Sequence, residues 1–118
     1  MASYAVQLRL DGKARVYRGS HTVAVVDDPE RAWERIRDMS ERWEVYRQAL
    51  EKMLSRALEL DYITSWAHNG ERWLVYGRSK SGLEQLRGDI EAMRGYKTSL
   101  DYSKYGLCLD VTVKETAI

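Results

Sequence analysis

Cysteine, histidine and long apolar runs are scarce in this chain of 118 residues. The single cysteine, Cys108, excludes an internal disulfide and a multi-cysteine metal site. The histidines, His21 and His68, lie far apart in or beside predicted turns, so we expect no metal ligand, no cofactor and no catalytic histidine. No segment approaches the roughly 18 apolar residues of a membrane span and no signal peptide is apparent, which indicates a cytoplasmic protein with no membrane partner.

An excess of either charge is also missing, because 19 basic and 18 acidic residues leave a formal net charge of +1 at pH 7. Residues 1–26 carry four basic residues and one acidic residue, net +3, whereas residues 27–61 carry seven basic and ten acidic residues, net −3. This distribution argues against a uniformly basic nucleic-acid binder but allows a local basic face. Asparagine occurs once, and arginine alternates densely with glutamate, which is compatible with a thermophilic source or with a GC-rich genome.

Glycine and proline are absent from the interior of residues 29–61, where apolar residues recur alternately four and three positions apart. This spacing predicts one long amphipathic helix, with Asp28 as its N-cap and Pro29 at its first position. Such a helix would be on the order of 50 Å long and would overhang a small sheet beneath it. An overhanging apolar stripe needs a partner, so we expect a homodimer; the alternative is a monomer whose helix breaks near Ser40 and folds back. The predicted interface residues are Ile36, Met39, Trp43, Tyr46, Leu50 and Met53.

Residues 4–18 are typical of a β-hairpin around an Asp-Gly pair. A two-residue loop would mix polar and apolar groups on both faces, whereas a three-residue loop pairs Leu8 with Ala14 and Val6 with Val16. We favour the second register, because it collects the apolar residues on one face. The opposite face then carries Gln7, Arg9, Lys13, Arg15 and Tyr17.

Two further strand signals flank the long helix. Residues 22–26 are almost entirely apolar, which favours a central strand. Downstream of the helix, the pair Asn69-Gly70 predicts a two-residue hairpin turn that places Trp66 opposite Trp73. We expect these tryptophans to be core or interface residues, and the alternative is a stacking platform on an open sheet face.

The last third of the chain predicts one more helix and one more strand. The segment from Ser81 to Glu84 fits a capping box, and the apolar stripe that follows stops at Gly95. Residues 96–106 look irregular, and residues 107–114 alternate as a strand. From residue 22 onward the element order predicts an α+β fold of the ferredoxin-like split β-α-β-β-α-β type, with an extra N-terminal β-hairpin and an unusually long first helix. We expect a single domain over residues 1–118.

Three basic features suggest contact with nucleic acid. The loop 77–82 precedes a helix N-terminus, where free N–H groups favour a phosphate; the plainer interpretation is an exposed loop with a capping serine. The segment 96–105 interleaves tyrosines with lysines, which suits single strands but also anchors loops onto cores. The polar face of the first hairpin is the third, and its alternative is a solvated strand face. The candidate phosphate or nucleic-acid contacts are Arg9, Lys13, Arg15, Arg78, Ser79, Lys80, Lys97 and Lys104.

These signals lead to three functional hypotheses, and no catalytic residue is predicted. The first is a small non-enzymatic homodimeric binding module, associated with DNA or RNA through a local basic surface. The second is a structural or assembly protein that acts through its long helix. The third is a small divalent-metal-dependent nuclease that uses Asp27, which follows an apolar strand, although the neighbouring Asp28 is already explained as a helix cap.

Overall fold

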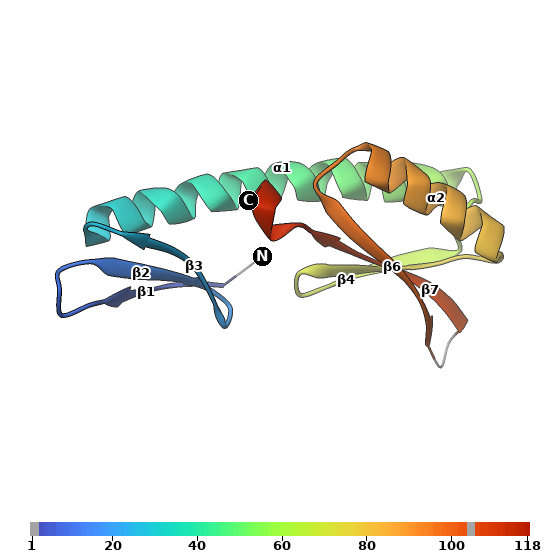
Figure 1. Cartoon of the computed structure of the whole chain (residues 1–118). Helices are drawn as coiled ribbons and strands as arrows, with labels where there is room; N and C mark the ends of the chain where they lie inside the picture. The colour runs from blue at the N-terminus through green and yellow to red at the C-terminus, as the bar shows by residue number, and fades with distance from the viewer. Residues whose placement is uncertain (1–2, 104–105) are drawn as a thin grey trace. The chain divides into compact units, whose positions relative to one another are not determined.

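The computed structural model describes residues 3–103 and 106–118 as an α+β protein with two antiparallel sheets and two α-helices (Figure 1). Contacts divide the chain into two compact units, Met1–Arg42 and Trp43–Ile118. The single domain over residues 1–118 stays a prediction. The elements are β1 (Tyr4–Leu8), β2 (Ala14–Arg18), β3 (His21–Val26), α1 (Pro29–Glu59), β4 (Ser65–Asn69), β5 (Arg72–Tyr76), α2 (Lys80–Ala92), β6 (Tyr96–Ser103), β7 (Gly106–Val113) and a 3₁₀ turn, η1 (Glu115–Ala117).

The first unit holds a three-stranded sheet in the order β1-β2-β3. Its hairpin has the predicted register, with Leu8 opposite Ala14, and Gly12 takes φ +84° in the turn. One sheet face contributes the fully buried Ala14 and Val16, which is the core that the alternation predicts. The prediction that residues 22–26 form a central strand is wrong, because β3 pairs with β2 alone and lies at the sheet edge.

The helix α1 begins and ends close to the predicted positions, with signals that its sequence supplies. Asp28 caps its N-terminus, since the Arg31 amide donates to Asp28 Oδ1 at 2.9 Å. At the other end Asp61 takes φ +66°, and the Tyr62 amide donates to the Ala57 carbonyl at 2.9 Å. This is the Schellman arrangement that closes a helix. No break occurs near Ser40, so that alternative is wrong. Among the described residues, neither α-helix combines the length and apolar character needed to cross a membrane.

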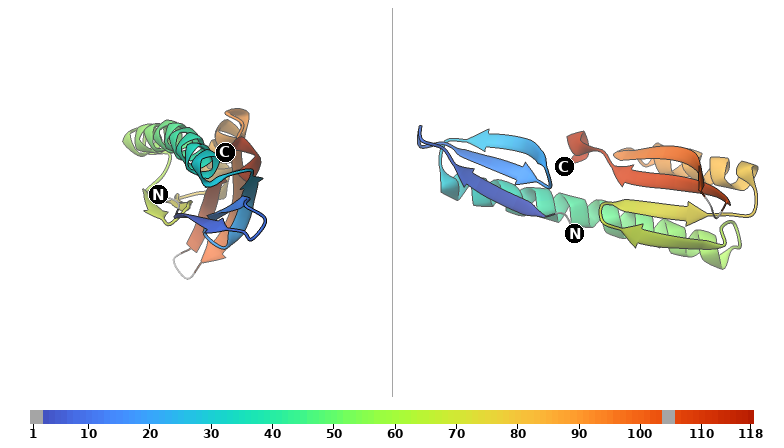
Figure 2. Two further views of the ribbon diagram at one scale, coloured as in Figure 1. Left: turned by 90° about the vertical axis from the view of Figure 1, so that its left-hand side faces the viewer. Right: turned by 90° about the horizontal axis from the view of Figure 1, so that it is seen from below.

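The second unit places α2 and the C-terminal part of α1 on one face of a four-stranded sheet, ordered β4-β5-β7-β6 (Figure 1). In Figure 2 the view from below shows these strands in front of the helices, so the other sheet face is uncovered. The buried core joins the two layers. Its buried residues include Trp43, Leu50, Leu54, Trp73, Val75, Leu83, Leu86, Ile90, Leu109 and Val111.

The ferredoxin-like arrangement is not confirmed, because strand order and strand number differ from it. The strand β3 is absent from the four-stranded sheet, and its place as a fourth strand is taken by β6, in the segment predicted to be irregular. The strand signal was present: Tyr96, Thr98 and Leu100 are buried or half-buried, whereas the residues between them are exposed.

Two turn positions also differ from the predictions. In the second hairpin Gly70 and Glu71 form the loop, so Trp73 pairs with His68 and not with Trp66. Gly70 has φ +65°, while its neighbours do not have positive φ; this is type II′ geometry, whereas a turn centred on Asn69-Gly70 would need positive φ at both. The cap of α2 is Ser79 and not the predicted Ser81, since Ser79 Oγ accepts from the Gly82 amide at 3.1 Å.

The Tyr96 hydroxyl connects the start of β6 to α1 by donating to the Tyr46 carbonyl at 2.6 Å. Burial, with a smaller contribution from the Tyr46 phenol, raises the pKa of Tyr96 to about 12. The unfolded chain releases this proton near pH 10. The stability that Tyr96 contributes is therefore complete below about pH 10 and is lost as the pH rises towards about 12.

We expect Tyr96→Phe to be less stable than the wild type at about pH 8, by about 0.5–1.5 kcal/mol, because it lacks this hydrogen bond. Urea unfolding at a series of pH values should show the wild type losing this advantage between about pH 10 and 12. Parallel pH profiles for the two proteins would contradict the assignment.

Candidate functional site

The outer face of the hairpin formed by β1, β2 and their turn carries the five polar residues that the register predicts. We call Gln7, Arg9, Lys13, Arg15 and Tyr17 the basic strand face. Gln7 lies directly opposite Arg15 in the ladder. The fourth cation of residues 1–26, Arg18, lies on the opposite face and is 8% exposed. The structure therefore gathers three of the predicted phosphate contacts on one surface, where Arg9 and Lys13 are exposed and Arg15 is half-buried.

Hydrogen bonds hold part of this surface in place. The Tyr17 hydroxyl donates to Gln7 Oε1 at 2.8 Å, and Arg15 Nη1 donates to the Tyr17 oxygen at 3.3 Å. At the turn, Arg9 forms an ion pair with Asp11 at 3.1 Å, and Asp11 Oδ1 accepts from the Lys13 amide. An open depression of about 470 Å³ lies between Arg9, Arg15 and the turn.

The loop before α2 is less available to a phosphate than its sequence suggests. The Ser79 hydroxyl is occupied as the helix cap, and Arg78 lies 3.7 Å from Asp61 in an exposed ion pair. Lys80 is the first residue of α2 and is exposed. The Arg78, Ser79 and Lys80 site stays a prediction.

Of the two lysines of the tyrosine-rich segment, the structure describes Lys97. Lys97 is exposed in β6, on the face that the helices leave uncovered. Lys104 lies outside the described residues, so its predicted role stays a prediction.

The residues predicted as a homodimer interface divide into two groups. Met39, Trp43 and Leu50 are buried within the chain, with 3%, 3% and 0% of their surface exposed. The half-buried residues Ile36, Tyr46 and Met53 keep surface that a partner could contact. The interface as such stays a prediction.

An aromatic cluster between α1, β4 and β5 was not predicted. The His68 ring stacks on Trp73 at a centroid distance of 4.6 Å, and Trp43 stacks on Trp73 at 5.8 Å. Trp73 Nε1 donates to Glu51 Oε1 at 3.2 Å. Glu51 also pairs with Arg47 at 2.6 Å. Trp43 and Glu51 lie two helical turns apart on α1, on the side that faces the sheet. This spacing alone does not predict the cluster, because the sequence does not show which strand packs against them.

The ion pairs of α1 beside this cluster are local. Arg47 bonds both Glu44 and Glu51, three and four residues away. The hydrogen bond from Arg47 lowers the pKa of Glu44, and the same bond raises the pKa of Arg47. These pairs between half-buried side chains hold the helix surface.

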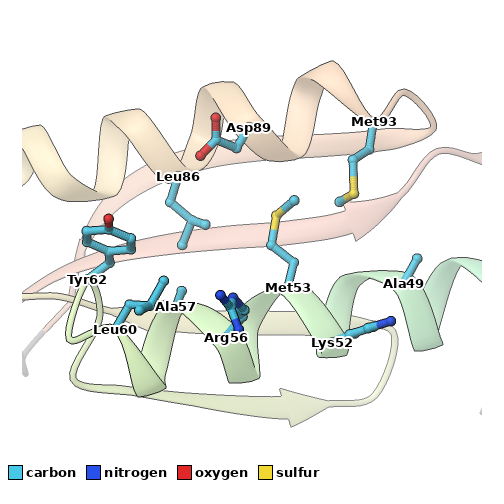
Figure 3. Close-up of a pocket in the computed structure, with 10 residues that line it drawn as sticks. All are labelled: Ala49, Lys52, Met53, Arg56, Ala57, Leu60, Tyr62, Leu86, Asp89 and Met93. Carbon is cyan, nitrogen blue, oxygen red and sulfur yellow. The ribbon is translucent and has the colours of Figure 1, made fainter.

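A groove between α1 and α2 is the second surface that sequence reasoning missed (Figure 3). It encloses about 370 Å³, and the side chains of Met53, Leu86 and Met93 point into it. Leu60 and Tyr62 stand at one end, 49% and 64% exposed. We call this surface the helix groove. Its sequence signal was the apolar stripe on each helix, but only the packing of the helices shows that the stripes leave a gap.

The two aspartates considered for a metal have other roles in the structure. Asp28 caps α1, and Asp27 lies 3.7 Å from Arg31 in an exposed ion pair. Over residues 3–103 and 106–118, no three histidine, cysteine, aspartate or glutamate side chains are grouped as metal ligands would be. The nuclease hypothesis stays a prediction.

Together, fold and surfaces define an α+β protein with two antiparallel sheets, one uncovered basic strand face and one apolar groove between helices. Comparisons of this chain with protein-family models, curated proteins and solved structures give no match.

Proposed function

We propose that this protein is a small, non-enzymatic, homodimeric module of the cytoplasm that binds the phosphate backbone of nucleic acid on the basic strand face. The observation that carries the proposal is the placement of Arg9, Lys13 and Arg15 on one face of the β1-β2 hairpin, where Arg9 and Lys13 are exposed and Arg15 is half-buried. Side chains on one face of a hairpin can meet successive phosphates of a nucleic-acid backbone.

The chemistry of the face suits a backbone more than a particular base. Guanidinium groups bind phosphate oxygens with two parallel hydrogen bonds, and the Tyr17 ring offers a surface on which a base can stack. Since Tyr17 and Gln7 already bond each other, fewer side-chain groups must be ordered on binding. Binding should therefore be largely independent of sequence and steeply dependent on salt.

Replacing Arg9 and Arg15 together by serine should reduce the slope of log affinity against log salt by about 1.4–1.8, because two phosphate contacts are lost. Fluorescence anisotropy with single- and double-stranded oligonucleotides at several salt concentrations measures this slope. The matched control replaces Arg35 and Arg37, which are exposed on α1 and remove the same charge. It should change the slope less.

The variant Asp11→Asn should increase the affinity for nucleic acid, whereas the double serine variant should reduce it. It keeps an oxygen acceptor for the Lys13 amide but releases Arg9 from its ion pair. Affinity should rise by up to about fivefold, since an exposed ion pair is worth about 0.2–1 kcal/mol. Wild-type protein that binds neither DNA nor RNA at about 50 mM salt would refute the proposal.

The helix groove supports the second candidate function, an assembly protein. An apolar groove lined by two methionines is the kind of surface on which helices and other chains dock. This candidate shares self-association with the first and needs no nucleic acid, so the binding measurements above separate the two.

A further inference from the structure

The charged residues at the opening of the helix groove are divided by sign between its two walls. Lys52 and Arg56 lie on α1, and Asp89 lies on α2 (Figure 3). All three are exposed. In the described part of the chain none of these three side chains has an ion-pair or hydrogen-bond partner, unlike those of Arg47 and Arg87, which pair with glutamates of their own helices. The groove thus presents one positive edge and one negative edge to its surroundings.

Apolar surface continues past these edges. Leu60 and Tyr62 remain largely exposed at the end of the groove, although both are large apolar side chains. The Tyr62 backbone is fixed by the turn that ends α1, where its amide bonds the Ala57 carbonyl. The ring is therefore presented on an ordered backbone, which lowers the entropy cost of a contact.

We propose that a second copy of this chain covers the helix groove, with α1 of each copy lying over α2 of the other. Two-fold symmetry makes the same patch meet itself, so the patch must be self-complementary. An axis along the groove brings Lys52 and Arg56 of one copy over Asp89 of its partner, twice in the dimer. An axis across the groove would set the positive edges against each other. The charges select the first arrangement.

This inference rests on the homodimeric part of the proposed function and names the surface that forms the dimer. The same axis brings the Leu60 and Tyr62 ends of the two copies together, where four exposed apolar side chains cover one another. Methionines in the groove adapt to such a contact, because their side chains are unbranched and flexible. Met53 lies in this groove, so it belongs both to the interface predicted from the sequence and to the interface proposed here.

Charge reversal tests the arrangement with the full chain. The variants Lys52→Glu/Arg56→Glu and Asp89→Lys each place like charges across the axis, and each should weaken self-association at least tenfold. Mixed in equal amounts, the two variants should recover the dimer, because each then meets opposite charges. Sedimentation or light scattering distinguishes the 13.7 kDa chain from a species of twice that mass.

The matched control is Arg35→Glu/Arg37→Glu, which makes the same charge change on exposed residues of α1 outside the groove and should leave the dimer intact. A wild type that stays at 13.7 kDa at about 100 µM would overturn the inference, as would reversal variants that remain dimeric alone. Two monomeric variants that stay monomeric when mixed would also overturn it. Nucleic-acid binding should also be measured on the same variants. Because these substitutions leave the basic strand face unchanged, this measurement tests the proposed nucleic-acid binding separately from the dimer interface.

Discussion

Replacing Gly95 by alanine is expected to lower the free energy of unfolding by about 2–5 kcal/mol, because two costs combine. Gly95 takes φ +88°, where a residue with a Cβ is strained. An added Cβ would also lie 2.5 Å from Tyr46 Cε1, too close for two carbon atoms. Moving the Tyr46 ring is costly as well, since it packs edge-on against Tyr96 at a centroid distance of 5.6 Å. Urea unfolding monitored by circular dichroism measures the loss.

Two comparisons separate these costs. Gly88→Ala adds the same methyl group within α2, where no atom lies within 4 Å of the new Cβ, and it should stabilise the protein by about 0.5–1 kcal/mol. In a double-mutant cycle, Tyr46→Ala should relieve the steric part of Gly95→Ala and leave the backbone strain. A Gly95→Ala protein as stable as the wild type would show that the turn is not held in this conformation.

Replacing Trp73 by alanine is expected to cost about 3–5 kcal/mol, the range for a large aromatic side chain removed from a packed core. Trp73 is fully buried at the centre of the sheet in the second unit. Its removal also leaves the rings of Trp43 and His68 without the ring they stack on, and it takes away the donor that Trp73 Nε1 supplies to Glu51 Oε1. Chemical denaturation gives the stability, and near-ultraviolet circular dichroism shows whether the remaining tryptophans stay ordered.

The control for this variant is Trp73→Phe. It retains an aromatic ring for the stack but lacks the Nε1–H that donates to Glu51. Its loss of stability should be smaller than that of the alanine variant, about 1–3 kcal/mol from the lost hydrogen bond and the reduced volume. Equal losses for both variants would mean that the hydrogen bond, and not the packing of the ring, dominates at this site.

The parts of the fold that the sequence predicts are those specified by local chemistry. Only one register of the first hairpin collects Val6 and Val16 on one face, and Gly12 can adopt the positive φ that its turn needs. The limits of α1 follow from Asp28, Pro29 and an uninterrupted apolar stripe. In these cases every interaction that decides the structure lies within a few residues along the chain.

The incorrect predictions concern segments whose structure depends on contacts with residues far away in the sequence. The apolar character of β3 suggests a central strand, but β2 takes the central place of this sheet and β3 pairs with β2 alone. The β6 segment looks irregular because its outward residues Lys97, Ser99 and Asp101 are as polar as a loop, and its pairing with β7 overrides that composition. The second hairpin shifts by one position because Gly70 occupies the first place of the turn.

The two candidate surfaces also differ in whether local sequence or distant contacts determine them. The basic strand face depends only on the register of one hairpin, so alternation in the sequence predicts it. The helix groove depends on how α2 packs beside α1, and Leu86 and Met53 meet there although they are 33 positions apart in the sequence. Nothing in the local sequence of either helix indicates that their stripes leave an opening between them.

The buried Cys108 gives the second unit its own chemical reporter. It is the only cysteine of the chain, it is 3% exposed, and it lies in β7 between its partners Tyr76 and Asp101. A thiol reagent can therefore modify the folded protein only when this part of the sheet opens. The labelling rate, compared with that of the unfolded chain, gives the free energy of opening under native conditions. Because the first unit contains no cysteine, the measurement follows one of the two units alone, without any engineered label.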